Sequence, residues 1–88
     1  MIRRHVIVHG DVQGVFFRET TRRRADAAGV AGWVRNRPDG TVEAVFEGVQ
    51  EAVERLVRFC AEGPRGAHVE RVEVAAGEPE GLDGFGVF

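Results

Sequence analysis

The chain has 88 residues, of which 43% are hydrophobic and 30% charged, and its formal net charge is -2. This composition suits a single small globular domain, residues 1–88, and the slight negative charge argues against a main role in binding the phosphate backbone of nucleic acids. No apolar run is long enough to span a membrane, and nothing near Met1 resembles a signal peptide. The single cysteine, Cys60, excludes an internal disulfide, so we expect a cytoplasmic protein.

The first third of the chain predicts a strand followed by a helix. Residues Arg4–His9 alternate, with Val6 and Val8 on one face, which indicates a strand with one buried face. After a loop that contains glycines, small and apolar residues recur with helical spacing over Phe17–Ala28. Gly29 is a suitable end for this helix.

The next segment predicts a hairpin of two strands. Gly32–Asn36 is expected to be the first strand, and Pro38-Asp39-Gly40 is typical of a tight turn. Residues 41–47 alternate as a second strand. We expect one face of that strand to be buried and the other to face solvent, with Val42, Ala44 and Phe46 inside and Glu43, Val45 and Glu47 outside.

The last part of the chain predicts a second helix and two more strands. Apolar residues repeat with helical spacing over Val49–Cys60. Val69–Val74 is expected to be a strand whose phase slips, which a bulge or a late start near Arg71 would explain. A polar connector, Ala76–Gly84, leads to a short closing strand, Phe85–Phe88.

The predicted order is β-α-β-β-α-β with a short final strand. This order matches the ferredoxin-like α+β sandwich, in which two helices cover one face of an antiparallel sheet. We therefore expect that fold class here.

The stretch Gly10–Arg18 joins the first strand to the first helix and is a candidate anion site. Glycines at such a joint let main-chain N–H groups and the positive end of the helix point at one spot. The stretch lacks the Walker A and dinucleotide-binding patterns, and its glycines alone are weak evidence of function. Arg18 strengthens the hypothesis, because a cation in the first helical turn opposes the helix dipole unless an anion lies nearby. The alternative is that Arg18 pairs with a surface acid such as Asp11.

Asn36 is a second candidate, at the end of the second predicted strand. Its amide offers one acceptor and two donors, so it could hold a water or a substrate oxygen without titrating. The alternative is that Asn36 only helps to form the hairpin turn.

Two motifs in the chain resemble signatures of the acylphosphatase family. The first reads His5-Val6-x-Val8-x-Gly10-x-Val12-Gln13-Gly14-Val15-x-Phe17-Arg18. The second reads Gly29-x-x-Gly32-Trp33-Val34-Arg35-Asn36-x-x-Asp39-Gly40-x-Val42-Glu43. The resemblance covers essentially the whole chain.

This resemblance implies the βαββαβ sandwich and the hydrolysis of acyl phosphates without metal or cofactor. It places the family's phosphate-binding arginine on Arg18 and its water-positioning asparagine on Asn36. It also implies that loop N–H groups bind the phosphate oxygens, namely those of Gln13, Gly14, Val15, Phe16, Phe17 and Arg18. The expected partner is a small acyl phosphate, with inorganic phosphate as product and competitive inhibitor and no nucleic acid or membrane partner. We expect a monomer.

Two departures and two alternative functions accompany this interpretation. Phe16 occupies a variable position of the family, often Gly or another aromatic, and the chain stops at Phe88 where relatives often continue.

The same fold also serves small ligand-sensing and RNA-binding modules, but the expected outer face lacks the aromatic platform that RNA binding uses. A module of a larger carbamoyl-phosphate-using protein is the other alternative. The histidines, including His5 and His9 on the outer face, show no metal-ligand spacing.

Overall fold

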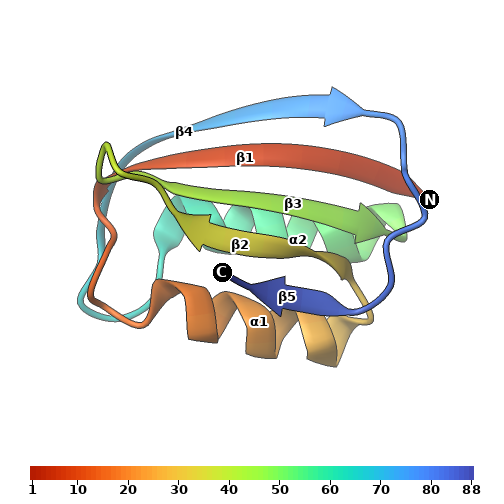
Figure 1. Cartoon of the computed structure of the whole chain (residues 1–88), viewed down its shortest axis with the longest axis horizontal. Helices are drawn as coiled ribbons and strands as arrows, with labels where there is room; N and C mark the ends of the chain where they lie inside the picture. Colours follow the sequence, from red (N-terminus) through yellow and green to blue (C-terminus); the bar gives the residue numbers. More distant parts are fainter.

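The structure, a computed structural model of residues 1–88, contains a five-stranded sheet and two helices (Figure 1). Every predicted element is present, with ends that differ by a few residues from the predicted ones. In chain order the elements are β1 (Ile2–Asp11), α1 (Phe17–Ala28), β2 (Ala31–Asn36), β3 (Val42–Gly48), α2 (Gln50–Glu62), β4 (His68–Gly77) and β5 (Phe85–Val87).

The strands lie in the order β4-β1-β3-β2-β5. The first four form the antiparallel sheet of the ferredoxin-like arrangement, as expected. The short closing strand β5 is added at the β2 edge and pairs with β2 in parallel, so the five-stranded sheet as a whole is mixed. The connector of residues 78–84 crosses from the β4 edge to the opposite edge, so β5 enters the sheet in the same direction as β2 (Figure 1).

Both helices cover the same face of the sheet, and the main core lies between them and the strands (Figure 1). Phe17 at the start of α1 packs against Phe59 of α2, with ring centroids 5.8 Å apart. The buried core residues are Val6, Val8, Val12, Phe17, Ala25, Val30, Val34, Val42, Ala44, Phe46, Val53, Leu56, Phe59 and Cys60.

The opposite face of the sheet is less exposed than the alternating pattern predicts. Val45 is fully buried and Glu47 is only 5% exposed, so the expectation that these side chains face solvent is wrong. Ile7 of β1 is buried on this face too. Burial here comes from neighbouring strands and from the 78–84 connector, which strand periodicity cannot reveal.

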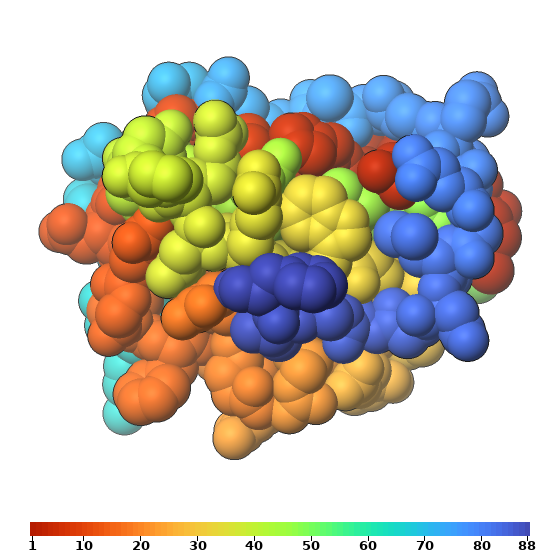
Figure 2. Space-filling view, viewed as in Figure 1, coloured from red at the N-terminus to blue at the C-terminus, as the bar shows by residue number.

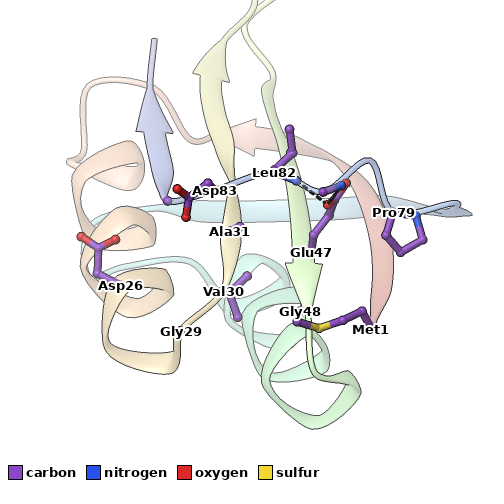
Figure 3. A pocket seen from close by; sticks show the side chains of 12 residues that line it. Met1, Asp26, Gly29, Val30, Ala31, Glu47, Gly48, Pro79, Leu82 and Asp83 are labelled. Atoms are coloured by element: carbon purple, nitrogen blue, oxygen red, sulfur yellow. Dashed lines mark hydrogen bonds between the residues drawn. The ribbon is translucent and has the colours of Figure 1, made fainter.

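The carboxylate of Glu47 holds the 78–84 connector against the sheet (Figure 3). It accepts main-chain N–H groups from Glu80 at 2.9 Å, Gly81 at 3.2 Å and Leu82 at 3.1 Å, and it pairs with Arg3. Burial by itself raises the pKa of the Glu47 carboxyl, but these N–H groups and the Arg3 guanidinium outweigh burial and place the pKa below its usual range. Glu47 is therefore an ionised anchor.

The predicted irregularity in the fourth strand is a bulge. His9 of β1 faces Arg71 of β4 and the next residue, Gly10, faces Val69, so Glu70 is the extra residue. Gly10 has φ 129°, and a Cβ there would lie 2.1 Å from the carbonyl oxygen of His68. Only glycine allows β1 to approach β4 this closely at the point where the chain leaves the sheet.

Candidate active site

The segment between β1 and α1, residues 12–16, presents unpaired main-chain N–H groups. Val12 is fully buried and anchors the segment, while Gln13 and Gly14 are exposed. No side chain caps α1 at its N-cap residue, Phe16, and the first N–H with a main-chain acceptor is that of Thr20, which donates to the Phe16 carbonyl. The N–H groups of residues 13–19 donate to no main-chain oxygen. We call this group of N–H donors the anion-binding corner, because free N–H groups at the positive end of a helix favour an anion.

Arg18 lies in the first turn of α1, beside this corner. Its guanidinium donates to the main-chain oxygen of Phe88 at 2.8 Å and forms no ion pair with Asp11. The alternative pairing with Asp11 is therefore wrong. Figure 2 shows the dark-blue end of the chain lying against the orange residues of α1 and the yellow residues of β2. A guanidinium has five N–H donors, so Arg18 keeps donors free for a ligand.

Asn36 ends β2 and faces Val42 of β3 in the pairing. Its side-chain oxygen Oδ1 is buried and has no hydrogen-bond partner. The hairpin turn is held by other groups: Asp39 accepts from the N–H and hydroxyl of Thr41, and Gly40 donates to the carbonyl of Arg37. Asn36 makes none of these turn hydrogen bonds, so its buried oxygen is a polar atom left without a partner, which is rare in a folded protein.

The Gln13 side chain joins the loop to the hairpin that carries Asn36. Its Nε2 donates to the carbonyl oxygens of Arg37 at 2.8 Å and Thr41 at 3.0 Å. Sequence reasoning assigned only the main chain of Gln13 and missed this side-chain role. The available signal was a polar residue between the loop glycines, which does not by itself name an acceptor elsewhere in the chain.

A cleft of about 380 Å³ opens beside the loop and is lined by Gly14, Phe16, Arg18, Glu19 and Val87. A slightly larger cleft, about 410 Å³, lies at the opposite end of the sheet between the α1 terminus and the 78–84 connector (Figure 3). That second cleft contains no residue of the loop and neither Arg18 nor Asn36. The smaller cleft is thus the one that adjoins the anion-binding corner.

The histidines on the outer face pair with carboxylates. The imidazole Nε2 of His5 lies 2.7 Å from Glu43, and that of His9 lies 2.6 Å from Glu73. Burial by itself raises the pKa of the Glu43 carboxyl, but hydrogen bonds from His5 and Arg35 lower it below its usual range. No group of three or more His, Cys, Asp or Glu side chains is arranged to hold a metal ion.

No helix in the structure is both long and apolar enough to cross a membrane. The fold and this loop place the chain in the class of small ferredoxin-like α+β sandwich proteins that carry an arginine beside unpaired N–H groups at the start of the first helix. Within that class, the acylphosphatase family model matches residues 4–87. The chain therefore belongs to the acylphosphatase family, a family of enzymes.

Individual relatives agree with this family membership. The chain is 59% identical to an acylphosphatase of Haloarcula marismortui, over 97% of this chain and 93% of the relative. It is 58% identical to an acylphosphatase of Gloeobacter violaceus, over 98% of this chain and 92% of the relative. The crystal structure of acylphosphatase from Bacillus subtilis superposes with a TM-score of 0.95 at 36% identity, covering 100% of this chain and 99% of that one.

Proposed function

We propose that this protein hydrolyses the carboxyl–phosphate bond of small acyl phosphates, giving a carboxylate and inorganic phosphate. The phosphate sits in the corner formed by the N–H groups of residues 13–18 and by Arg18, and a water held by Asn36 attacks phosphorus in line with the leaving carboxylate. The reaction uses no metal or cofactor. The observation that carries the proposal is the buried, unpartnered Oδ1 of Asn36, on the hairpin to which Gln13 of the loop donates two hydrogen bonds.

The anion-binding corner supports the electrostatic part of this reaction. Phosphoryl transfer spreads negative charge over the three equatorial oxygens and depends mainly on positioning and charge stabilisation. N–H groups that donate to no main-chain oxygen can stabilise that charge without first breaking a main-chain hydrogen bond. The Arg18 guanidinium adds a full positive charge and a planar pair of donors that fits two phosphate oxygens.

Asn36 supports the positioning of the nucleophile. Its Oδ1 can accept a hydrogen bond from one O–H of the attacking water, and this contact would satisfy the only buried side-chain oxygen or nitrogen atom that lacks a partner. Two hydrogen bonds from the Gln13 amide connect the phosphate loop to the hairpin that carries Asn36. They hold water and phosphate in a fixed relation, which is the requirement for in-line attack.

The proton balance needs no protein base. The water oxygen forms a bond to phosphorus while the bond between phosphorus and the acyl oxygen breaks, and the carboxylate leaves with the electron pair. The proton of the water ends on a phosphate oxygen of the substrate itself. His5 and His9 lie on the other face of the sheet and pair with Glu43 and Glu73. A bell-shaped pH–rate profile governed by a protein histidine would contradict this step.

The test is the hydrolysis of benzoyl phosphate, with a chelator present, by the wild type and the variants Arg18→Gln and Asn36→Ala. We expect Arg18→Gln to lower kcat and raise KM, because Arg18 contacts the phosphate before and during reaction. We expect Asn36→Ala to lower kcat by about 100-fold or more with a smaller effect on KM. Inorganic phosphate should inhibit competitively, and more weakly in Arg18→Gln.

The matched control is Arg23→Gln, on the same helix. The Arg23 side chain is 74% exposed, and its one ion-pair partner is Glu19 at 3.4 Å. The Arg23→Gln substitution removes the same charge as Arg18→Gln, and Glu19 keeps its closer ion pair with Arg22, so kcat and KM should stay near the wild-type values. Absence of turnover in the wild type would overturn the proposed function. Full activity in folded Arg18→Gln or Asn36→Ala would overturn that residue's role.

A further inference from the structure

Phe16 has a main-chain conformation that its residue type disfavours. Its φ is 60° and its ψ is 26°, in the left-handed region. Every other residue with positive φ in the chain is glycine, nine in all, so Phe16 is the single exception. A Cβ at this φ crowds the following carbonyl oxygen and costs free energy. Residues held in this way concentrate at functional sites.

The side chain of Phe16 does not offset this cost by packing in the core. It is 82% exposed, whereas its neighbour Phe17 is 2% exposed and packs on Phe59. Phe16 gives α1 no side-chain cap either. The phenyl ring therefore contributes little to the fold, and the sequence keeps it at a position where glycine would be easier to accommodate.

The ring stands at the wall of the cleft that adjoins the anion-binding corner. The cleft is also lined by Arg18, Val87 and Gly14, which has no side chain. A Cβ at Gly14 would meet nothing within 4 Å, so that side of the cleft is open. Glu19, the remaining wall residue, is held by Arg22 and Arg23. The cleft thus places an apolar surface next to a phosphate-binding cation.

We propose that Phe16 determines substrate specificity by packing its ring against the acyl group, so that the enzyme favours acyl phosphates with an aromatic or bulky apolar acyl group. This inference rests on the proposed function, because the phosphate must sit in the anion-binding corner for the acyl group to reach the ring. Offset or edge-to-face contact between the ring and an aromatic acyl group would add to the area that both bury.

The experiment measures kcat/KM for benzoyl phosphate and for acetyl phosphate in the wild type, Phe16→Asn and Phe16→Trp. Asparagine tolerates the left-handed conformation and removes the ring, whereas tryptophan keeps an aromatic surface. Both substrates share the phosphate, so any disturbance of the loop main chain cancels in the ratio of the two kcat/KM values. We expect that benzoyl-to-acetyl ratio to fall about tenfold in Phe16→Asn and to stay within about twofold in Phe16→Trp.

A second measurement reports binding without turnover. Phenacylphosphonate and acetonylphosphonate replace the bridging oxygen of the two substrates by a methylene, so they should bind without being hydrolysed. The ratio of their inhibition constants should shift in Phe16→Asn in the same direction as the ratio of kcat/KM. If both ratios keep the wild-type value in Phe16→Asn, even when activity on the two substrates falls in parallel, the proposed role of Phe16 is overturned. That result would leave the proposed function intact. Failure of the wild type to hydrolyse either substrate would overturn the proposed function as well.

Discussion

Replacing Glu47 by glutamine should destabilise the fold, because an amide cannot satisfy all the donors that face this carboxylate. One carboxylate oxygen accepts from Arg3 and from the N–H of Glu80, and the other accepts from the N–H groups of Gly81 and Leu82. In Glu47→Gln the amide nitrogen must take one of the two oxygen positions. At either position the amide N–H group faces two donors that previously had an acceptor there. Two hydrogen bonds are therefore lost.

The magnitude follows from those contacts. A hydrogen bond to a charged group contributes about 1.5–3 kcal/mol. The bonds to Gly81 and Leu82 are long, at 3.2 and 3.1 Å, so we expect the lower part of that range for each. The free energy of unfolding should therefore fall by about 3 kcal/mol, which for a domain of this size lowers Tm by roughly 12–24 °C.

The pH dependence gives a second, independent signature. The pKa of the Glu47 carboxyl is lower in the folded protein than its usual value of 4.5. The ionised carboxylate therefore makes its full contribution to the free energy of unfolding above pH 4.5. It is lost as the pH falls through the folded-state pKa, because the protonated acid no longer attracts the donors. The gap in unfolding free energy between wild type and Glu47→Gln should therefore be widest near pH 7 and narrow below pH 4.5.

Urea or thermal unfolding between pH 3 and pH 7 measures both quantities. The control is Glu80→Gln, whose side chain is 66% exposed and lies 3.6 Å from Arg3. Such an exposed ion pair contributes about 0–1 kcal/mol, so this variant should stay close to the wild type. If Glu47→Gln is within about 0.5 kcal/mol of the wild type at pH 7, or if the gap does not change with pH, the anchoring role of Glu47 is refuted.

Three further predictions concern other residues. Gln13→Ala should lower kcat/KM by about tenfold or more while costing only about 1–2 kcal/mol of stability, and unchanged benzoyl phosphate hydrolysis would contradict its positioning role. Cys60 is fully buried, and burial raises its thiol pKa to about 12. Iodoacetamide at pH 8 should therefore label Cys60 only in denaturant. Rapid labelling of the folded protein, detected by mass spectrometry, would refute this prediction. Gly32→Ala should cost about 3 kcal/mol or more in urea unfolding, since its Cβ would lie 1.8 Å from the carbonyl oxygen of Val45. Gly40→Ala, with nothing within 4 Å of its Cβ, should cost only about 1–2 kcal/mol, and equal losses in the two glycine variants would contradict the steric explanation.

The sequence was sufficient to predict the order and type of the elements. Composition predicted a helix over Glu19–Ala28, with an apolar stripe that begins at Phe17, and α1 spans Phe17–Ala28. The slip in phase before Val72 predicted a bulge or a late strand start near Arg71, and the structure contains the bulge. These features follow from local spacing, because a helix or strand face repeats over a few residues whatever surrounds it.

The direction of β5 and the burial of the outer face depend on tertiary structure. Nothing in Phe85–Val87 says which edge strand it joins or in which direction, since three residues carry no register of their own. Glu47 occupies a position that alternation assigns to solvent, yet the 78–84 connector covers it. Contacts between segments far apart in the chain decide both features.

The candidate site also combines features that the sequence predicted with features that only the folded structure revealed. The two motifs were enough to indicate Arg18, Asn36 and the loop N–H groups as candidates, because residue type and local position suggest what each can bind. Only the folded chain showed that Asn36 Oδ1 is buried without a partner, that Gln13 joins the loop to the hairpin, and that Phe16 carries the one positive φ outside glycine. Neighbouring residues determine which chemical groups a segment offers, whereas burial, long-range hydrogen bonds and backbone strain depend on contacts between segments far apart in the chain.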